Sequence, residues 1–274
     1  MEEIKKNLAA LAAARADNAF KKNLLKEYLQ IVVLDFIYSA PKYAQLVFYG
    51  GSCLKHCHDL PRLSEDLDFV DIGRQIDIGG LAADLEFYFK KNTDLEVKTA
   101  MQKFRIYLKF PILRQLGLSA AGESDFLFLK IEIFKDFDFC RDFKMEIVPV
   151  FKSGRSILIR TFDLPTMMAT KIRAIFLRKW EKTAKGGEVI AKVKGRDYFD
   201  LMWYLQKNIK PNTNCVENVE GIFDLKKKLI KAVEKTDEKS IRADLEPLIA
   251  DREFLKDLSK NIKTILIGQI GLMK

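Results

Sequence analysis

The 274-residue sequence lacks any long hydrophobic run. No apolar stretch reaches the roughly 18 residues that a membrane-spanning helix needs, and the N-terminal residues Met1 to Lys6 do not contain the apolar core of a signal peptide. We therefore expect a cytoplasmic protein that has no membrane partner.

Cysteine and histidine are also scarce, with four cysteines and two histidines in the chain. The cysteines do not have the spacing of a disulfide framework, which is typical of a reducing compartment. Cys53, His56, Cys57 and His58 lie close together, but no second cluster of zinc ligands follows them. We interpret the two cysteines as core residues and both histidines as helix-cap or surface residues.

Internal repeats, low-complexity tracts and a Pro- or Ser-rich linker are absent as well. Because the length exceeds the usual size of one compact domain, we expect two subdomains. Strand patterns occur in residues 1–154, whereas residues 155–274 have almost only helical patterns. This order predicts an α+β fold class, in which a mixed sheet flanked by helices is followed by a C-terminal helical subdomain.

Positive charge is in excess, because 47 Lys and Arg residues against 38 Asp and Glu residues give a formal net charge of +9. Such a surface attracts polyanions, and RNA is a natural candidate. Part of the excess brackets the glycine pair at positions 186 and 187, at Lys179, Lys182, Lys185, Lys192 and Lys194. This basic segment is either an RNA contact or a solubilising loop.

The most informative stretch begins with a predicted buried strand, Leu46 to Tyr49, which stops at Gly50 and Gly51. Glycines permit the backbone angles of a tight turn, and a helix that starts there points backbone N–H groups at an anion. Ser52 stands at the expected N-cap and adds a hydroxyl. The pattern predicts either a phosphate-binding turn or an ordinary strand-to-helix turn.

Two acids follow on a second predicted strand. Alternation places Asp66 and Asp68 on one face, with Leu67 and Phe69 on the other. At a 4 Å approach and an effective dielectric near 20, two such charges repel by about 4 kcal/mol, so a close pair implies a cation between them. Hard oxygen ligands favour Mg²⁺ or Mn²⁺. The alternative is a solvated strand face.

Three further positions extend this candidate site. Arg62 and Ser64 precede the acids on the same face; Arg62 can hold a triphosphate oxygen or pair with Glu65 or Asp59. A third strand, residues 126–134, places Lys130 and Glu132 on one face, so Glu132 is the candidate third carboxylate and Glu146 on the next strand is its rival.

The helical half carries a second group of candidates. A helix that begins after Asp163 contains Lys171, and Arg178 seven residues later shares its face. Asp197 begins another helix and points toward its buried side, so it needs a partner such as Arg196, Lys171 or a bound nucleotide. Asp200 either joins the site or braces the helix.

These blocks together resemble the AbiEii/AbiGii-type nucleotidyltransferase toxins, including the MenT group, within the polymerase-beta-like superfamily. The resemblance rests on a Gly-Gly-Ser turn, an Arg-x-Ser-Glu-Asp-Leu-Asp-Phe block, a Lys-x-Asp/Glu block and an Arg-Asp-x-x-Asp block. They are found at residues 48–55, 62–69, 130–132 and 196–200. No such block falls in residues 76–123.

The resemblance implies a nucleotidyltransferase fold and a metal-dependent enzyme. Asp66, Asp68 and Glu132 would hold one or two Mg²⁺ (or Mn²⁺) ions, and Lys171 and Asp197 would complete the catalytic set. The NTP phosphates would lie on residues of the turn and its surroundings, which are Gly50, Gly51, Ser52, Arg62, Ser64 and Lys171.

The resemblance also implies an acceptor and a partner. The acceptor would be a tRNA 3′ end, so that the enzyme acts as a toxin of a toxin-antitoxin or phage-defence system, and the partner would be a winged-helix antitoxin. Transfer to a protein or a small molecule, or a catalytically silent RNA- or partner-binding relative, are the alternatives.

Overall fold

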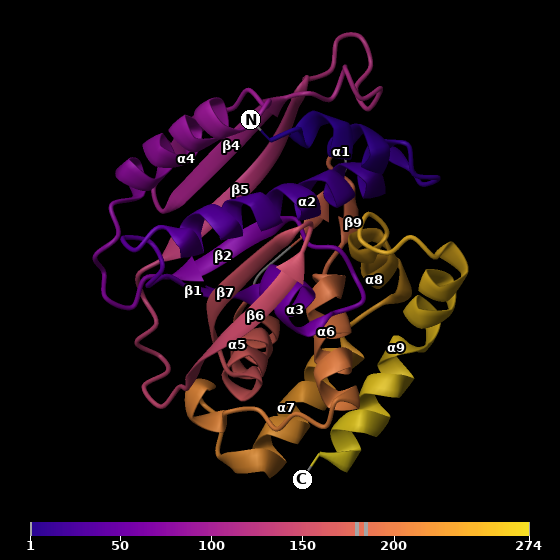
Figure 1. The fold of residues 1–274 in the computed structure, drawn as a ribbon. Coiled ribbons are helices and arrows are strands. Elements are labelled where there is room, and N and C mark those ends of the chain that lie inside the picture. Colours follow the sequence, from indigo (N-terminus) through magenta and orange to yellow (C-terminus); the bar gives the residue numbers. More distant parts are fainter. Residues whose placement is uncertain (1, 179–180, 184–185, 274) are drawn as a thin grey trace. The chain divides into compact units, whose positions relative to one another are not determined.

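The computed structural model describes residues 2–178, 181–183 and 186–273 (Figure 1). The chain divides into two compact units: the first comprises Met1–Phe137 and Glu146–Thr161, and the second comprises Asp138–Met145 and Phe162–Lys274. The division falls after Thr161 instead of after residue 154. The reason is that Thr161, near the end of a late strand, pairs with Phe48 and so belongs with the sheet of the first unit.

The first unit is built on a mixed sheet, as predicted. Among the described residues, seven strands form it in the order β3-β4-β5-β2-β1-β7-β6. The strand β2 is antiparallel to β1 and parallel to β5, and β4 is antiparallel to both β3 and β5. The strands are β1 (Val47–Tyr49), β2 (Asp66–Val70), β3 (Lys98–Gln102), β4 (Arg105–Pro111), β5 (Phe126–Phe134), β6 (Met145–Lys152) and β7 (Arg155–Phe162).

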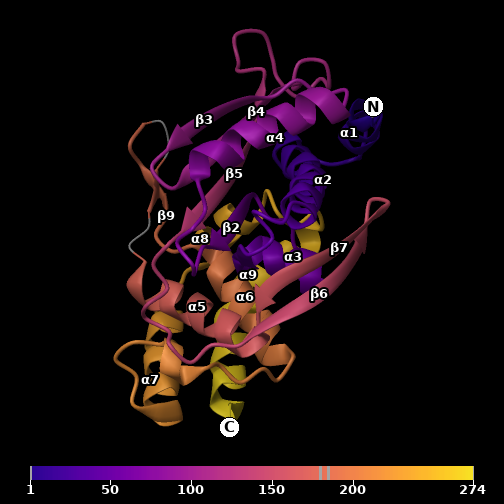
Figure 2. The same cartoon turned by 60° about the vertical axis from the view of Figure 1, so that its left-hand side comes forward.

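Helices cover one face of this sheet. The described part of the unit contains α1 (Ile4–Ala12), α2 (Asn18–Ser39), α3 (Gly50–His58) and α4 (Ile78–Asn92). The long helix α2 packs against β5, and α4 packs against β3 and β4 (Figures 1 and 2). The ring of Phe89 on α4 lies 5.2 Å from that of Phe110 on β4. The stretch without a family block supplies α4, β3 and β4.

Alternation along β5 separates the two faces of the sheet. Leu127, Leu129, Ile131 and Ile133 are buried beneath the helices, whereas Phe128 is 42% exposed on the other face. The core face is therefore apolar, and polar residues are gathered on the opposite face.

The second unit is mainly helical, as predicted. Its described elements are α5 (Leu164–Leu177), β8 (Lys182–Thr183), β9 (Val189–Ala191), α6 (Gly195–Gln206), η1 (Thr213–Cys215), α7 (Gly221–Glu234), α8 (Glu238–Leu245) and α9 (Arg252–Leu272). The helix α6 contacts α5, α8 and α9 and is buried along almost its whole length. A Cβ on Gly195 would lie 2.8 Å from the Ile241 backbone, so only glycine permits this close approach of α6 to α8.

The cysteines differ from the sequence-based prediction. Cys140 and Cys215 form a disulfide that spans 75 residues, so the expectation that the cysteines are unpaired is wrong for these two. The two cysteines are far apart in the sequence, and the fold brings them together. Cys53 and Cys57 are free, and Cys53 packs in the core with its Sγ 3.0 Å from the Thr161 hydroxyl. In the part of the chain that the structure describes, no helix is both long and apolar enough to cross a membrane.

Candidate active site

The glycine turn joins β1 directly to α3. Gly50 has φ +81°, and a Cβ at that position would lie 2.8 Å from Oδ2 of Asp68, so the turn both requires glycine and touches the acid strand. The N-cap of α3 is Tyr49, so the expectation that Ser52 caps the helix is wrong. Ser52 lies inside the first turn and is fully buried.

Buried hydroxyls connect the turn to β2. Ser52 Oγ lies 2.9 Å from Ser64 Oγ and donates a hydrogen bond to the carbonyl oxygen of Asp66. Gln30 on α2 donates from Nε2 to the carbonyl of Ser64 at 3.1 Å. Both serine hydroxyls are therefore used within the protein, and they hold the acid strand against the turn.

His56 supports the same network from below. Its Nε2 lies 2.9 Å from Oε1 of Gln30, and its side chain is buried, which corrects the expectation of a cap or surface histidine. Burial, with smaller contributions from Lys152 and Lys55, lowers the pKa of His56 to about 3, so the ring is neutral. Sequence reasoning missed the role of Gln30, although a glutamine among the buried residues of an apolar helix was the available signal.

Arg62 lies beneath the turn. It is 2% exposed, and NH1 donates to the carbonyl of Leu63 at 2.8 Å. A Cβ on Gly51 would lie 2.6 Å from NH2 of Arg62, so the guanidinium packs directly under the turn backbone. This position favours support of the turn over direct contact with a bound phosphate.

The three candidate carboxylates lie on adjacent strands and on one face. Asp68 on β2 is directly opposite Glu132 on β5, and Asp66 is opposite Lys130. Residues paired in this way point to the same side of a sheet. Glu146 lies on β6, which two strands separate from β2. The sheet order therefore favours Glu132 as the third acid.

Two basic side chains contact this cluster of carboxylates. Lys130 Nζ lies 2.9 Å from Asp66 and 3.2 Å from Glu132, and Arg105 Nε lies 2.5 Å from Glu132. Burial acts to lower the pKa of Lys130, but the two carboxylates outweigh it and the pKa is raised. The lysine stands where a positive charge is needed between repelling acids.

The donor chemistry of this face suits a divalent cation. Carboxylate oxygens are ligands that Mg²⁺ and Mn²⁺ prefer, and the strand register presents three of them together. Within the described residues, however, no group of three His, Cys, Asp or Glu side chains is placed to hold a metal ion. The residue types fit the metal, and the Lys130 amine now contacts two of the candidate ligands, Asp66 and Glu132.

A second polar group is built inside the helical unit. Lys171 on α5 bridges two acids of α6, with Nζ 2.9 Å from Asp197 and 2.8 Å from Asp200. Arg178 lies 2.5 Å from the other oxygen of Asp197, which confirms that Lys171 and Arg178 share a face. Burial acts to raise the pKa of Asp197, but Lys171 and Arg178 outweigh it and the pKa is lowered. Lys171 and Arg178 are therefore the partners that the buried Asp197 needs.

A comparison with protein-family models identifies these blocks. The model described as nucleotidyl transferase AbiEii toxin, type IV toxin-antitoxin system, matches residues 34–271. The chain belongs to the AbiEii family. It is therefore a nucleotidyltransferase of a family of toxins from type IV toxin-antitoxin systems, and the predicted resemblance is confirmed.

One solved structure shows the same fold. The crystal structure of JHP933 from Helicobacter pylori is 17% identical, with a TM-score of 0.51 over 92% of this chain and 93% of that chain. A putative nucleotidyltransferase from H. pylori is 17% identical, with a TM-score of 0.46 over 92% of this chain and 97% of that chain. No curated protein matches the sequence.

Arg196 and Lys194 lie at the start of α6. Arg196 donates to Asp244 on α8 through its backbone and its guanidinium. Lys194 is half-buried; burial, with Arg196 and Arg178, lowers its pKa to about 8. Of the predicted basic segment, Lys179, Lys185 and the Lys182 side chain lie outside the described residues, and Lys192 is exposed.

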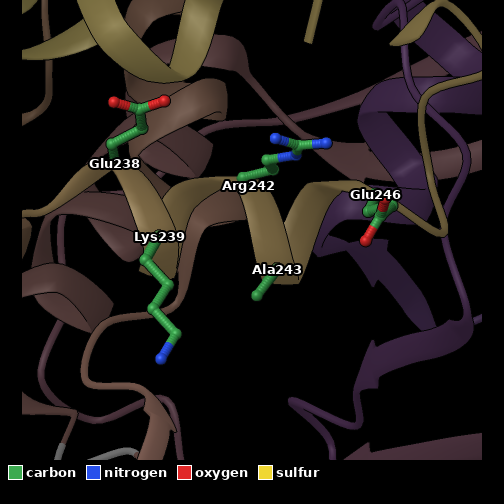
Figure 3. Close-up of a pocket in the computed structure, with 5 residues that line it drawn as sticks. All are labelled: Glu238, Lys239, Arg242, Ala243 and Glu246. Atoms are coloured by element: carbon green, nitrogen blue, oxygen red, sulfur yellow. The ribbon is translucent and has the colours of Figure 1, made fainter. Parts of the chain in front are cut away.

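One surface hollow of the AbiEii chain is unrelated to these groups. It lies on α8 and is lined by Glu238, Lys239, Arg242, Ala243 and Glu246 (Figure 3). Glu238 and Arg242 point to one side of the helix and Lys239 and Ala243 to the other. Opposite charges alternate along it, so we assign it no function.

The structure thus gathers the predicted site residues into two groups. Gly50, Ser52, Ser64 and the acids of β2 and β5 form one group in the first unit, with Arg62 beneath them. Lys171, Asp197 and Asp200 form the other in the second unit. Each group is internally bonded.

Proposed function

We propose that this AbiEii-family enzyme transfers a nucleotidyl group from an NTP to the 3′ end of an RNA, foremost a tRNA, with Mg²⁺ or Mn²⁺ as cofactor. The observation that carries the proposal is the set of three carboxylates on adjacent strands, with Asp68 in contact with the Gly50 turn. Nucleotidyl transfer requires carboxylates that can bind a metal ion and, beside them, backbone N–H groups that can bind phosphate.

Asp66, Asp68 and Glu132 are the proposed metal ligands. When bound, a divalent cation supplies Lewis-acid stabilisation of phosphate charge and lowers the pKa of an attacking hydroxyl. The chain's own contribution is to hold the ligands at fixed register and to keep Lys130 as a replacement charge when no metal is bound. Arg105 keeps one oxygen of Glu132 engaged.

The first turn of α3 is the proposed phosphate site. The backbone N–H groups of Gly51 and Ser52 belong to the first turn of a helix, where the partial positive charge of the helix favours anions. Ser52, Ser64 and Arg62 act by holding this turn and β2 in place, because their polar groups bond within the protein. Lys171, by resemblance to the family, would offset triphosphate charge, with Asp197 and Asp200 positioning its amine.

The acceptor and partner follow from the family and from charge. A net charge of +9 favours a polyanionic acceptor, and the family is one of toxin-antitoxin systems. We therefore propose that a tRNA 3′ end accepts the nucleotidyl group in the cytoplasm and that a winged-helix antitoxin counteracts the enzyme.

The proposal is tested by incubating the protein with total cellular RNA and each α-³²P-labelled NTP in Mg²⁺. Label should enter RNA with at least one NTP, and Asp68→Asn should abolish it, while Asp136→Asn, whose side chain is 94% exposed, should not. Label in protein or in a small molecule instead would favour the other acceptors. No label anywhere, and no rise in melting temperature with any NTP and Mg²⁺, would favour a silent binding relative.

A further inference from the structure

The acid face of the sheet continues beyond the carboxylates toward the outer strand β3. Register pairs Lys130 of β5 with Tyr107 of β4, and Phe128 with Lys109. Lys109 in turn pairs with Lys98 on β3. All of these side chains therefore lie on the same side of the sheet as Asp66, away from α2 and α4.

This face is open to solvent and mixes aromatic with basic side chains. Phe128 is 42% exposed, its ring lies 6.2 Å from that of Phe126, and Lys109 Nζ lies 5.9 Å from its centroid. Tyr107 is half-buried, with its hydroxyl 3.3 Å from Gln102 on β3. Flat rings thus stand between cationic groups across neighbouring strands.

The outer strands carry two lysines that face each other. Lys98 and Lys109 occupy directly opposite positions, where like charges destabilise a sheet. Among the described residues neither ammonium group makes a hydrogen bond or an ion pair, although Lys98 acts electrostatically on Glu86 of α4. In contrast, Arg105 and Lys130 are paired with the acids. The excess positive charge is therefore at the β3–β4 end of the face and the carboxylates are at the other end.

We propose that this face, formed by Lys98, Tyr107, Lys109, Phe126 and Phe128, binds the single-stranded end of the RNA acceptor. Bases stack on exposed aromatic rings of a sheet, and lysines between them neutralise the phosphates. A strand that crosses from β3 to β2 covers three strand spacings, roughly 14 Å. Its terminal hydroxyl then arrives at Asp66 and Asp68, where the proposed transfer takes place.

Single-stranded RNA fits this surface better than a duplex or a protein does. Stacking needs unpaired bases, which a duplex does not offer, whereas the row of lysines favours a polyanion over an apolar protein surface. The identity of the acceptor as RNA rests on the proposed function. Binding, however, can be measured without any transfer.

The test measures binding of a fluorescein-labelled single-stranded RNA octamer with a free 3′ hydroxyl by anisotropy, without NTP or metal. Phe128→Ala/Lys109→Ala should weaken binding at least about fivefold, the lower end of the loss of one stacked base. The matched control is Phe87→Ala/Lys91→Ala, which removes another lysine-over-phenylalanine pair, with Nζ 5.4 Å from the ring, on α4 at the opposite face. It should leave binding unchanged.

Two further measurements separate the outcomes. Lys98→Ala should reduce the dependence of binding on salt, because each phosphate contact to a single strand contributes about 0.7 to the slope. A blunt duplex of the same sequence should bind more weakly than the single strand. Equal binding by wild type and Phe128→Ala/Lys109→Ala, with unchanged melting temperatures, overturns the inference even if transfer occurs. If Phe128→Ala/Lys109→Ala loses RNA binding but the wild type transfers no nucleotidyl group, the binding surface stands and only the proposed function is overturned.

Discussion

Lys130 Nζ lies 2.9 Å from Oδ2 of Asp66. The same amine lies 3.2 Å from Glu132, so one lysine neutralises two of the acids that we propose as metal ligands. A charge in this place stabilises the metal-free fold, and it competes with a metal for the same oxygens. This relationship has a measurable consequence.

We expect Lys130→Met to lower the melting temperature of the metal-free protein and to enlarge the rise in melting temperature that Mg²⁺ causes. Without the amine the acids repel one another, and a bound cation relieves that repulsion. Thermal melting with and without Mg²⁺ measures both effects, with Lys109→Met as control. An Mg²⁺-induced rise no larger than that of the wild type would contradict the competition.

Gly50→Ala should destabilise the protein by about 1 to 3 kcal/mol, because its φ of +81° is unfavourable for alanine. The new Cβ would also lie 2.8 Å from Asp68 Oδ2 and displace that carboxylate. Transfer activity should therefore fall more than stability alone explains.

Gly122→Ala is the matched control for this glycine. Gly122 has φ +87°, but a Cβ there would have no atom within 4 Å. Gly122→Ala should therefore lose stability through backbone strain but retain transfer activity. Equal activity of both variants, measured at a temperature where each is folded, would exclude a role for the turn in placing Asp68.

Lys171→Met should cost about 3 to 5 kcal/mol of unfolding free energy, because it leaves buried carboxylates without their shared partner. Asp200 is fully buried, and Arg178 pairs with the other acid, Asp197. The double variant Lys171→Met/Asp200→Asn should lose less than the sum of the two single variants.

Urea unfolding measures this coupling, and Lys228→Met is the control. Lys228 pairs with Asp224 one turn away on the surface of α7, so its loss should have a far smaller effect. If the losses of unfolding free energy in the two single variants add up to the loss in the double variant, Lys171 and Asp200 are not energetically coupled.

The lowered pKa of Lys194 predicts that the stability of the protein depends on pH. Burial, Arg196 and Arg178 lower its pKa from 10.5 to about 8, so between these values the unfolded chain holds a proton that the folded chain lacks. The free energy of unfolding contributed by this group therefore rises with pH across that window.

Lys194→Met removes this contribution. The variant should be more stable than the wild type at pH 7 by on the order of 2 kcal/mol, and the difference should shrink toward pH 10. Urea midpoints at pH 7 and pH 9.5 measure the change, with the exposed Lys192→Met as control. A difference that is the same at both pH values would contradict the lowered pKa.

The sequence predicts this site in part. Alternation correctly places Asp66 and Asp68 on one face and Lys130 and Glu132 on one face, because a strand has a period of two. It cannot reveal that β2 pairs with β5 in parallel, which makes Asp68 the neighbour of Glu132. Strand pairing depends on residues far apart in the chain.

Buried polar contacts could not be predicted from the sequence, because they too join residues that are far apart in the chain. Gln30 and His56 meet across 26 positions, and Cys140 and Cys215 across 75. Arg62 is two positions from Ser64, and the local pattern left a phosphate contact and an acidic partner open; tertiary packing places its guanidinium next to Gly51. Local periodicity predicts the direction of a side chain, but not the partner that it meets.

The central claim is that the paired acids transfer a nucleotidyl group to an RNA end. The most direct measurement is the mass of one purified tRNA after incubation with the protein, Mg²⁺ and each NTP in turn. We predict that its 3′ end gains nucleotide residues with the wild type and none with Asp68→Asn. An unchanged tRNA mass with all four NTPs, while the wild-type protein releases pyrophosphate and transfers the nucleotidyl group to another acceptor, would contradict the account.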